Sequence, residues 1–420
     1  MIDPTPHLER FTSYQQAVRE FRWSIPERIN LATEILRRHP DPVTRIALNE
    51  KKFGGINTYT FGGLDFLSDK FANALSECGI IAGTRVVIAL PPSAALAVAQ
   101  LGCLKAGSVV VPIAPIASPP RIEHAIDATH AKAIILDESL SASVCGAGNI
   151  PTNITRFEVR DLRPTTIATI STRDFWNEIN RSSSDFESVE VDSRSPAFIF
   201  FIEKNNGTVG VVHSPRSVIS QLAGFEFFSE IDNCSTHISE TSDQRYQQSH
   251  AYWAGDDWSS VFSLLGVVYP AWWYGCSIVA NSSDDNSLTQ TVLDCEVTDV
   301  FLPCSTQSRS LQTLPAGTRF NEVYGTAETG WIFGISKKLT EPNADPCCRV
   351  VPGRLVEIVD SKGRVLPFYE AGQLAIHRSD VGLFNEYLGA SEQSSAADWF
   401  LTGKSGYKDV RGVLHIESDG

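Results

Sequence analysis

The sequence predicts an α/β protein in which two doubly wound βαβ units are followed by a small antiparallel β-barrel. Through the first two thirds of the 420 residues, short β-branched runs alternate with segments of helical period. That order is typical of parallel sheets covered by helices. From Arg354 onward the pattern changes to short alternating strands separated by turn residues. We expect a first unit at residues 1–190, a second at 191–345 and the barrel at 346–420.

The first unit carries clear helix and strand patterns. Apolar residues recur at helical spacing within 64–75, and Gly79 is well placed to end that helix. The runs RVVIAL (85–90) and SVVVPI (108–113) are typical of buried strands. Ser93 can cap the helix expected between them, which makes a βαβ unit.

A connection leads into the second unit. The stretch 165–194 is rich in Ser, Thr and Asp, so we interpret it as a linker between the two units. The runs AFIFFI and VGVVH then predict strands, Ser214 and Pro215 mark a helix start, and SIVA, TDVFLP and RFNEV predict further strands. In the last unit RLVEIVD, RVLP, GQLAIHR and GVLHI alternate with turns, which predicts the barrel.

Composition excludes several classes of protein. The formal net charge is −14, from 35 basic and 49 acidic residues, and this argues against a nucleic-acid binder. Nine cysteines occur without a CxxC pair, so we expect reduced thiols and no metal site. The N-terminal MIDPTPHLERF has no apolar signal core and no apolar run is long enough to span a bilayer, so we expect a cytoplasmic protein without a membrane span.

Several segments follow one another in a recognisable order: FRWSIPERINLATEIL, YTFGGLDFLSDKFANAL, LKAGSVVVPIAP, DDWSSVFSLLGVVYPAWWYG, NEVYGTAETG and DWFLTGKSGYKDVRGVLHI. Taken together, they resemble the adenylate-forming superfamily, and most closely its acetyl- and medium-chain acyl-CoA synthetases. The resemblance covers essentially the whole chain and implies the large-domain fold of that superfamily. It also implies the family reaction, in which a carboxylate and ATP form an acyl-adenylate and a thiol of CoA or phosphopantetheine then displaces AMP. ATP, Mg²⁺ and CoA are the cofactors so implied.

The ATP-binding positions of this family are altered here. Its phosphate loop reads roughly TSGTTGxPKGVVHS, whereas residues 201–214 read FIEKNNGTVGVVHS, with Glu203 among the positions of the hydroxyls and the first glycine, and Val209 at the lysine position. A carboxylate near a triphosphate repels it. The family's ribose-binding TGD reads TGK, so Lys404 offers donors where an acceptor is required. Ser418 lies at the family's acidic hinge and the chain stops at Gly420, so we expect the C-terminal lid to be absent.

Other positions keep the family pattern. Tyr324, Gly325 and Thr326 match the adenine-side motif, and Glu328 matches the magnesium-binding glutamate, although Ala327 replaces the common threonine. For the first three residues the alternative is a strand-to-loop turn kept for packing. For Glu328 the alternative is a solvated acid at a helix start.

The acyl side of the family site is matched by Asp257 and Trp258, which resemble a DW pair beside the acyl pocket. A buried core tryptophan is the alternative interpretation, and the one we prefer. No group of residues predicts a metal site.

These observations lead to one main functional hypothesis and two alternatives. The main hypothesis is a homologue of AMP-dependent acyl-CoA ligases with a dismantled ATP site, inactive alone as a ligase. It would be an accessory protein that binds an acyl or aryl group, an acyl-CoA or a phosphopantetheine carrier protein, with a pathway enzyme as a further partner. One alternative is an adenylating acyl- or aryl-CoA ligase that needs a lid in trans. The other is an enzyme with changed chemistry, such as thioester hydrolysis or acyl transfer, in the inherited pocket.

Overall fold

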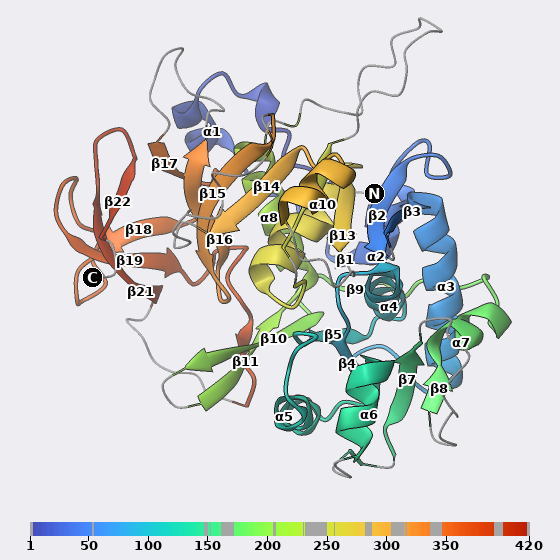
Figure 1. Cartoon of the computed structure of the whole chain (residues 1–420). Helices are drawn as coiled ribbons and strands as arrows, with labels where there is room; N and C mark the ends of the chain where they lie inside the picture. Colours follow the sequence, from blue (N-terminus) through green and yellow to red (C-terminus); the bar gives the residue numbers. More distant parts are fainter. Residues whose placement is uncertain are drawn as a thin grey trace, which may run out of the picture.

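Two large mixed sheets with helices between and outside them form the body of the protein (Figure 1). The computed structural model describes residues 3–52, 54–146, 150–151, 153–160, 172–204, 207–229, 231, 250–255, 257–281, 288–303, 315, 317–336, 347–389 and 398–417. The predicted α/β class is confirmed. Parallel strands form the centre of each large sheet, with antiparallel strands at one edge of the first sheet and at both edges of the second.

The first sheet has eight strands in the order β20-β11-β10-β5-β4-β6-β7-β8. Their bounds are β4 (Arg85–Ala89), β5 (Val109–Pro112), β6 (Ala133–Asp137), β7 (Thr155–Val159), β8 (Thr172–Asp174), β10 (Phe198–Lys204), β11 (Gly207–His213) and β20 (Glu386–Tyr387). The second sheet also has eight strands, in the order β17-β16-β15-β14-β12-β13-β2-β3. Their bounds are β2 (Ile46–Lys52), β3 (Gly55–Thr60), β12 (Ala251–Trp253), β13 (Ser277–Asn281), β14 (Asp299–Pro303), β15 (Arg319–Thr326), β16 (Gly330–Ser336) and β17 (Cys347–Val350).

The two sheets are interleaved along the chain. Strands β2 and β3 come early in the sequence yet belong to the second sheet, and β10 and β11 come after residue 190 yet belong to the first. Each large sheet therefore draws strands from more than one of the three predicted segments. The division at 1–190, 191–345 and 346–420 stays a prediction.

A layer of helices lies between the two large sheets and holds the largest apolar cluster. Because side chains alternate along a strand, Val86 and Ile88 of β4 join this central cluster, while Val87 and Ala89 pack with α5 on the outer face. The helices that contribute to the central cluster include α2 (Leu31–Arg37), α3 (Phe61–Glu77), α4 (Ala94–Lys105), α8 (Pro215–Phe228), the π-helical η2 (Val261–Val268) and α9 (Tyr269–Trp273). Outside the sheets lie α5 (Pro119–Thr129), α6 (Glu138–Gly146) and α10 (Leu288–Asp294).

Helix α4 is buried along its whole length, as expected for a helix whose residues are apolar all round. Its predicted cap is confirmed, because Ser93 Oγ accepts a hydrogen bond from Leu96 N at 3.2 Å. Its last residue, Lys105, is fully buried and lies 2.6 Å from both Asp65 and Asp69. A buried charge needs such partners, and the two ion pairs connect α4 to α3.

The predicted linker 165–194 is wrong in part. Residues 172–174 form β8, which pairs with β7, and α7 (Phe175–Arg181) follows. The Asp174 carboxylate caps α7 by accepting from Asn177 N at 2.9 Å, and Phe175 is buried. Asp and Ser are common in loops and at helix caps alike, so composition did not separate the two.

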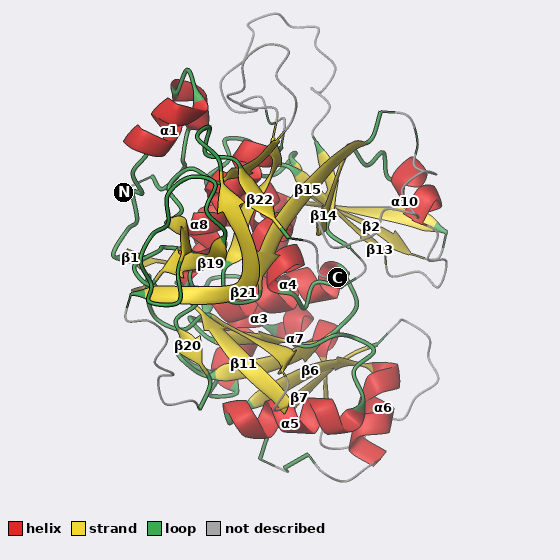
Figure 2. Ribbon diagram, turned by 90° about the vertical axis from the view of Figure 1, so that its left-hand side faces the viewer, coloured by secondary structure: helices red, strands yellow, loops and turns green. Residues whose placement is uncertain are grey.

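The last unit is the expected antiparallel structure, a four-stranded sheet that curls into a half-barrel. Figure 2 shows β21 as its long, curved strand. The strands are β18 (Val356–Val359), β19 (Gly372–His377), β21 (Trp399–Lys408) and β22 (Leu414–Ile416). The N-terminal elements η1 (Leu8–Arg10) and α1 (Tyr14–Glu20) lie on the same side of the molecule as the half-barrel. The short strands β1 (Arg28–Ile29) and β9 (Val191–Asp192) pair with each other.

None of the helices in the described ranges is both long enough and apolar enough to cross a bilayer.

Candidate functional site

The segment that resembles the phosphate loop folds as a β-hairpin. Strands β10 and β11 pair in unbroken antiparallel register from Phe198 opposite His213 to Lys204 opposite Gly207. Val209, at the family's lysine position, lies opposite Ile202 in this ladder. Backbone groups that pair within a ladder are no longer directed at a ligand, unlike those of an open glycine-rich loop.

The hairpin end places Lys204 directly on Glu328. Lys204 Nζ lies 2.8 Å from Glu328 Oε1, and it also donates to the Tyr387 hydroxyl at 2.5 Å. The same hydroxyl donates to Glu328 Oε1 at 2.8 Å. Glu328 follows β15 in the second sheet, whereas Lys204 and Tyr387 belong to β10 and β20 of the first. The three side chains therefore form a closed triangle between the two sheets.

The charges within this triangle stabilise one another. Burial raises the pKa of Glu328, but hydrogen bonds from Lys204 and Tyr387 and the Lys204 charge hold it below its ordinary value of 4.5. Burial lowers the pKa of Lys204, yet the bonds to Glu328 and Tyr387 leave that pKa raised. For Tyr387, burial raises the pKa to about 12, helped by the Glu328 charge and opposed by Lys204. At neutral pH the triangle contains a carboxylate, an ammonium and a neutral phenol.

Glu328 is the residue that would hold Mg²⁺ if the family's cofactor were bound. Magnesium prefers oxygen ligands in octahedral geometry. Here Oε1 already bonds to an ammonium and a phenol, so a metal ion at that oxygen requires Lys204 to leave. Within the described residues no three His, Cys, Asp or Glu side chains gather as a metal site. As arranged, these residues do not fit a magnesium–nucleotide complex.

Beside the triangle lies a cavity of about 420 Å³. Its lining includes Phe201 and Ile202 from the hairpin, Asp257 from the segment before η2, and Ala327 next to Glu328. Arg121 of α5 also lines it. The structure thus brings three separately predicted segments around one cavity: the altered phosphate loop, the acyl-side pair and the adenine-side motif.

Glu203 points away from the triangle and binds a different cation. Its carboxylate lies 3.2 Å from Arg121 Nη1 and accepts hydrogen bonds of 3.1 Å from Thr208 Oγ1. Both members of the ion pair are largely exposed, so the pair adds little to stability. It does link Arg121, which lines the cavity, to the hairpin.

The adenine-side motif forms the turn between β15 and β16. Tyr324 stacks on Phe333 with ring centroids 4.7 Å apart, and Thr326 N donates a hydrogen bond to Thr329 Oγ1 at 3.0 Å. A Cβ on Gly325 would lie 2.0 Å from Gly330 O, so the close approach of the strands requires glycine. The packing explanation therefore accounts for Gly325. It leaves the nucleotide role of Tyr324 and Thr326 a prediction.

The acyl-side pair divides into one cavity residue and one core residue. The Asp257 carboxylate accepts from Ser259 N at 2.7 Å and lines the cavity. Trp258 is fully buried and packs edge-to-face on Trp272, with centroids 6.2 Å apart. The interpretation of Trp258 as a core tryptophan agrees with this packing.

Lys404 lies on an irregular part of β21. The register passes from Gln373 opposite Ser405 to Ala375 opposite Leu401, so Lys404 belongs to a bulge. Lys404 N donates to Thr402 Oγ1 at 3.3 Å. Ser418 lies outside the described residues.

Sequence reasoning missed Tyr387 and Arg121 as members of this site. Tyr387 comes from a short edge strand, and its partner Glu328 is far away in the chain. Arg121 follows the paired prolines of α5 and looks like any exposed helix cation. Neither residue stands in a motif, so no local signal could have found them.

Comparison with known proteins agrees with this architecture. The model of the AMP-binding enzyme family matches residues 34–303. A mitochondrial acyl-coenzyme A synthetase, ACSM3 of Rattus norvegicus, is 24% identical over 468 aligned residues, covering 97% of this chain and 75% of the relative. An acetyl-coenzyme A synthetase of Pasteurella multocida (strain Pm70) is 29% identical over 252 residues, covering 55% of this chain and 38% of the relative.

Solved structures show the same fold. An acyl-CoA synthetase of Brucella canis superimposes with a TM-score of 0.83 at 17% identity, covering 97% of this chain and 80% of that one. The ATP-bound MatB of Rhodopseudomonas palustris gives 0.74 at 16% identity, with 92% and 78% covered. Because the family model spans more than half of the sequence, the chain belongs to the AMP-binding enzyme family, whose relatives here are acyl-CoA ligases.

Proposed function

We propose that this chain is a non-adenylating member of its family that binds an acyl or aryl group, either free, as an acyl-CoA or on a phosphopantetheine carrier protein. The observation that carries the proposal is the contact between Lys204 and Glu328. The Lys204 ammonium contacts the carboxylate at the family's magnesium-binding position. Lys204 belongs to β10, one of the two strands found in place of an open phosphate loop.

Nucleotide binding would have to break this arrangement. To bind a magnesium–triphosphate complex, Glu328 would have to be released from Lys204 and Tyr387. The triphosphate would also meet Val209 at the position where the family's phosphate loop has a lysine. Each charge-assisted contact that is missing costs about 1.5–3 kcal/mol. Two such losses reduce affinity by a factor on the order of a thousand.

The cavity beside the triangle supports binding of an apolar acid or thioester. Apolar side chains such as Phe200, Phe201 and Val261 form much of its wall, and Arg121 and Asp257 supply polar groups. Apolar pockets with a few convergent polar groups are typical of small-molecule sites, and a volume of about 420 Å³ lies within their usual range. An acyl or aryl group of modest size suits it.

Ligand-dependent thermal stability tests the proposal. Acyl-CoAs of increasing chain length, free acids and holo carrier protein are compared at matched concentrations. A ligand at about 100 times its Kd stabilises the fold by about 2.7 kcal/mol, which is readily measured. We expect stabilisation by at least one acyl compound, its loss in Phe201→Asp, and its retention in Ile81→Asp, a matched change at an exposed apolar residue elsewhere. If no acyl compound stabilises the protein, or if Phe201→Asp binds normally, the proposal fails.

Adenylation with a lid supplied by another chain is the second candidate. The residues that favour it are Tyr324, Thr326 and Glu328, which stand at the family's nucleotide positions. Stabilisation by Mg·ATP that disappears in Glu328→Gln would support it.

The hydrolase or acyl-transfer alternative needs a nucleophile activated by a base. His213 is a poor base here because its Nε2 bonds to the Ala327 carbonyl oxygen at 2.7 Å and burial lowers its pKa to about 4. No described contact of His213 favours this alternative.

A further inference from the structure

A second, larger hollow lies between α1 and the half-barrel, away from the family site. Its volume is about 970 Å³. One wall comes from α1 and the segment after it, the floor from residues 350–357, and the other wall from the strands and turns of the half-barrel. We call it the α1–barrel groove. It has no described lining residue in common with the 420 Å³ cavity.

The groove displays large apolar side chains to solvent. Val18 of α1, Leu355 before β18, Phe368 before β19 and Val410 after β21 are between 46% and 63% exposed, and all four line it. They come from four separate segments of the chain. Scattered exposed apolar residues are ordinary, but a cluster that converges on one hollow marks a binding site.

The floor of the groove is held in place by specific contacts. Trp23 Nε1 donates to Gly353 O at 2.9 Å, and Trp23 packs edge-to-face on Phe21 with centroids 4.8 Å apart. Gly353 has a φ of +84°, and a Cβ there would lie 2.4 Å from the Phe21 ring. Behind it the buried Arg354 forms a 2.8 Å ion pair with Asp380. The hollow is therefore preformed and does not result from loose packing.

Basic residues outnumber acidic ones in the lining, although the protein is acidic. Five lining residues are basic and one, Glu357, is acidic, in a chain of net charge −14. The basic residues are Arg19, Arg22, Arg354, Lys408 and Arg411. Four of them form ion pairs with acidic residues: Arg19 with Glu20, Arg354 with Asp380, Lys408 with Glu357 and Arg411 with Asp409.

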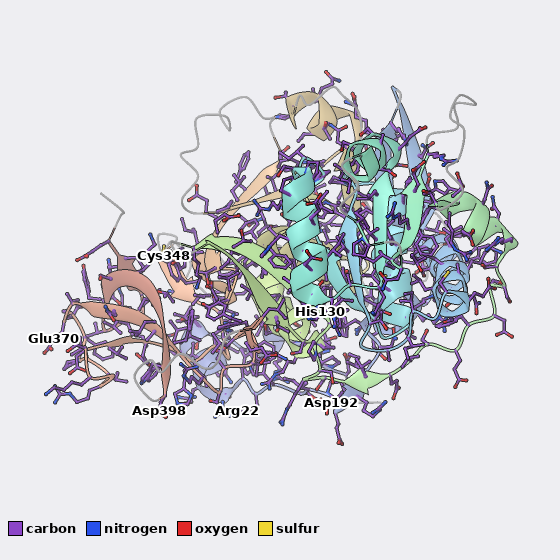
Figure 3. The ribbon with its side chains drawn as sticks, turned by 90° about the horizontal axis from the view of Figure 1, so that it is seen from below. Arg22, His130, Asp192, Cys348, Glu370 and Asp398 are labelled. Carbon is purple, nitrogen blue, oxygen red and sulfur yellow. The ribbon has the colours of Figure 1, made fainter. Side chains whose placement is uncertain are left out.

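Arg22 is the basic residue that differs. It donates only to the main-chain carbonyl oxygens of Arg19 and Phe21 and has no acidic partner among the described residues. Figure 3 shows Arg22 at the same edge of the molecule as Asp398, which precedes the groove residue Trp399. A guanidinium without an acid, next to apolar walls, suits an anionic head attached to an apolar body.

We propose that the α1–barrel groove binds a free, single-chain anionic amphiphile, with its acyl chain against Val18, Phe368 and Val410 and its carboxylate or phosphate head at Arg22. The volume lies near the upper end of the range for small-molecule sites, about 300–1,000 Å³, and accommodates a medium or long chain. The site is independent of acyl binding in the 420 Å³ cavity.

Calorimetric titration with laurate and dodecyl phosphate, both below their critical micelle concentrations, tests this proposal. Dodecanol is the uncharged control, and anionic phospholipid vesicles test a membrane surface as the source of the same chemistry. We expect the two anions to bind and dodecanol to bind at least about tenfold more weakly, since a charge-assisted contact is worth about one factor of ten or more.

Variants locate the site. Arg22→Gln should weaken laurate binding about tenfold, and Val410→Asp and Val18→Asp should each abolish it by placing a carboxylate in the groove. All three positions are at the surface, and circular dichroism and thermal unfolding verify that the variants fold. Ile81→Asp, at an equally exposed apolar residue outside the groove, should bind laurate normally.

Three results would overturn the proposal. One is no laurate binding, another is binding that Arg22→Gln, Val18→Asp and Val410→Asp leave unchanged, and the third is binding to vesicles alone. Loss of laurate binding in Phe201→Asp with retention in the groove variants would assign the ligand to the 420 Å³ cavity. That last result would contradict the groove site while supporting the proposed function.

Discussion

The ammonium group of Lys204 lies 2.8 Å from a carboxylate oxygen of Glu328, although the two residues belong to different sheets. Tyr387 closes the contact by accepting from the lysine and donating to the glutamate. A basic residue thus contacts the carboxylate that the resemblance assigns to magnesium. The same three side chains tie the two sheets together at the cavity.

Glu328 should make stability pH-dependent at the acidic end. Its pKa in the folded protein is held below the ordinary 4.5, so its contribution is complete above pH 4.5 and is lost as the pH falls through the folded pKa. We expect Glu328→Gln to lower the free energy of unfolding by about 2 kcal/mol at pH 7. The difference between variant and parent, measured by urea unfolding, should shrink below pH 4.5. A difference that grows on acidification would contradict the charged state described for the triangle.

Lys204 and Glu328 should be energetically coupled. The lysine side chain is 39% exposed, so solvent screens the pair and the coupling should be about 1 kcal/mol rather than the larger value of a fully buried pair. A double-mutant cycle of Lys204→Met and Glu328→Gln measures it by denaturant unfolding. Lys132→Met, at an exposed position, is the matched control and should change stability little. Strict additivity in the cycle would mean that the contact has no energetic weight.

Lys105 should be among the most sensitive residues of the core. It is fully buried, and its ammonium lies 2.6 Å from both Asp65 and Asp69. Replacement by methionine keeps the packing volume but leaves Asp69 buried without its main counter-charge. We expect Lys105→Met to cost about 3–5 kcal/mol, measured by thermal and denaturant unfolding. Adding Asp69→Asn should recover part of that loss, and a double variant no more stable than the single one would argue against the ion-pair explanation.

His213 should destabilise the protein as the pH falls below neutrality. Burial lowers its pKa from 6.5 to about 4, so the unfolded chain binds a proton there that the folded chain excludes. The resulting loss develops between pH 6.5 and about 4 and reaches at most about 3 kcal/mol. His213→Gln should flatten the stability curve in this window, which thermal unfolding at stepped pH would measure. Identical curves for parent and variant would contradict a buried neutral imidazole.

Local patterns predicted much of the fold. The cap at Ser93 and the apolar run of α4 lie within one short segment, so their structure follows from neighbours in the chain. Composition failed at 172–181, because Asp174 looks like a loop residue and is in fact a helix cap. Sheet membership could not be predicted from local patterns either, since β2 joins a sheet whose other strands mostly follow it by some 200 residues or more in the sequence.

The candidate site was predictable only where a motif carries it. Glu328 and Tyr324 were predicted as site residues because NEVYGTAETG resembles a known pattern, and only Glu328 joins the contacts described here. The partner of Glu328 was not found, because Lys204 acquires its role from the hairpin register and Tyr387 from an edge strand. Such contacts depend on the pairing and packing of strands that are far apart in the chain, and local patterns in a single sequence do not reveal these.

Calorimetric titration of Mg·ATP into the protein tests the central claim most directly. The parent chain, with Lys204 on Glu328, should give no binding heat at millimolar nucleotide, while an acyl-CoA or acyl acid gives a saturable signal. Binding of Mg·ATP with a Kd well below about 1 mM, equivalent to more than about 4 kcal/mol of affinity, would contradict the account. Loss of that binding in Glu328→Gln would then locate the nucleotide at the family site and restore adenylation as the function.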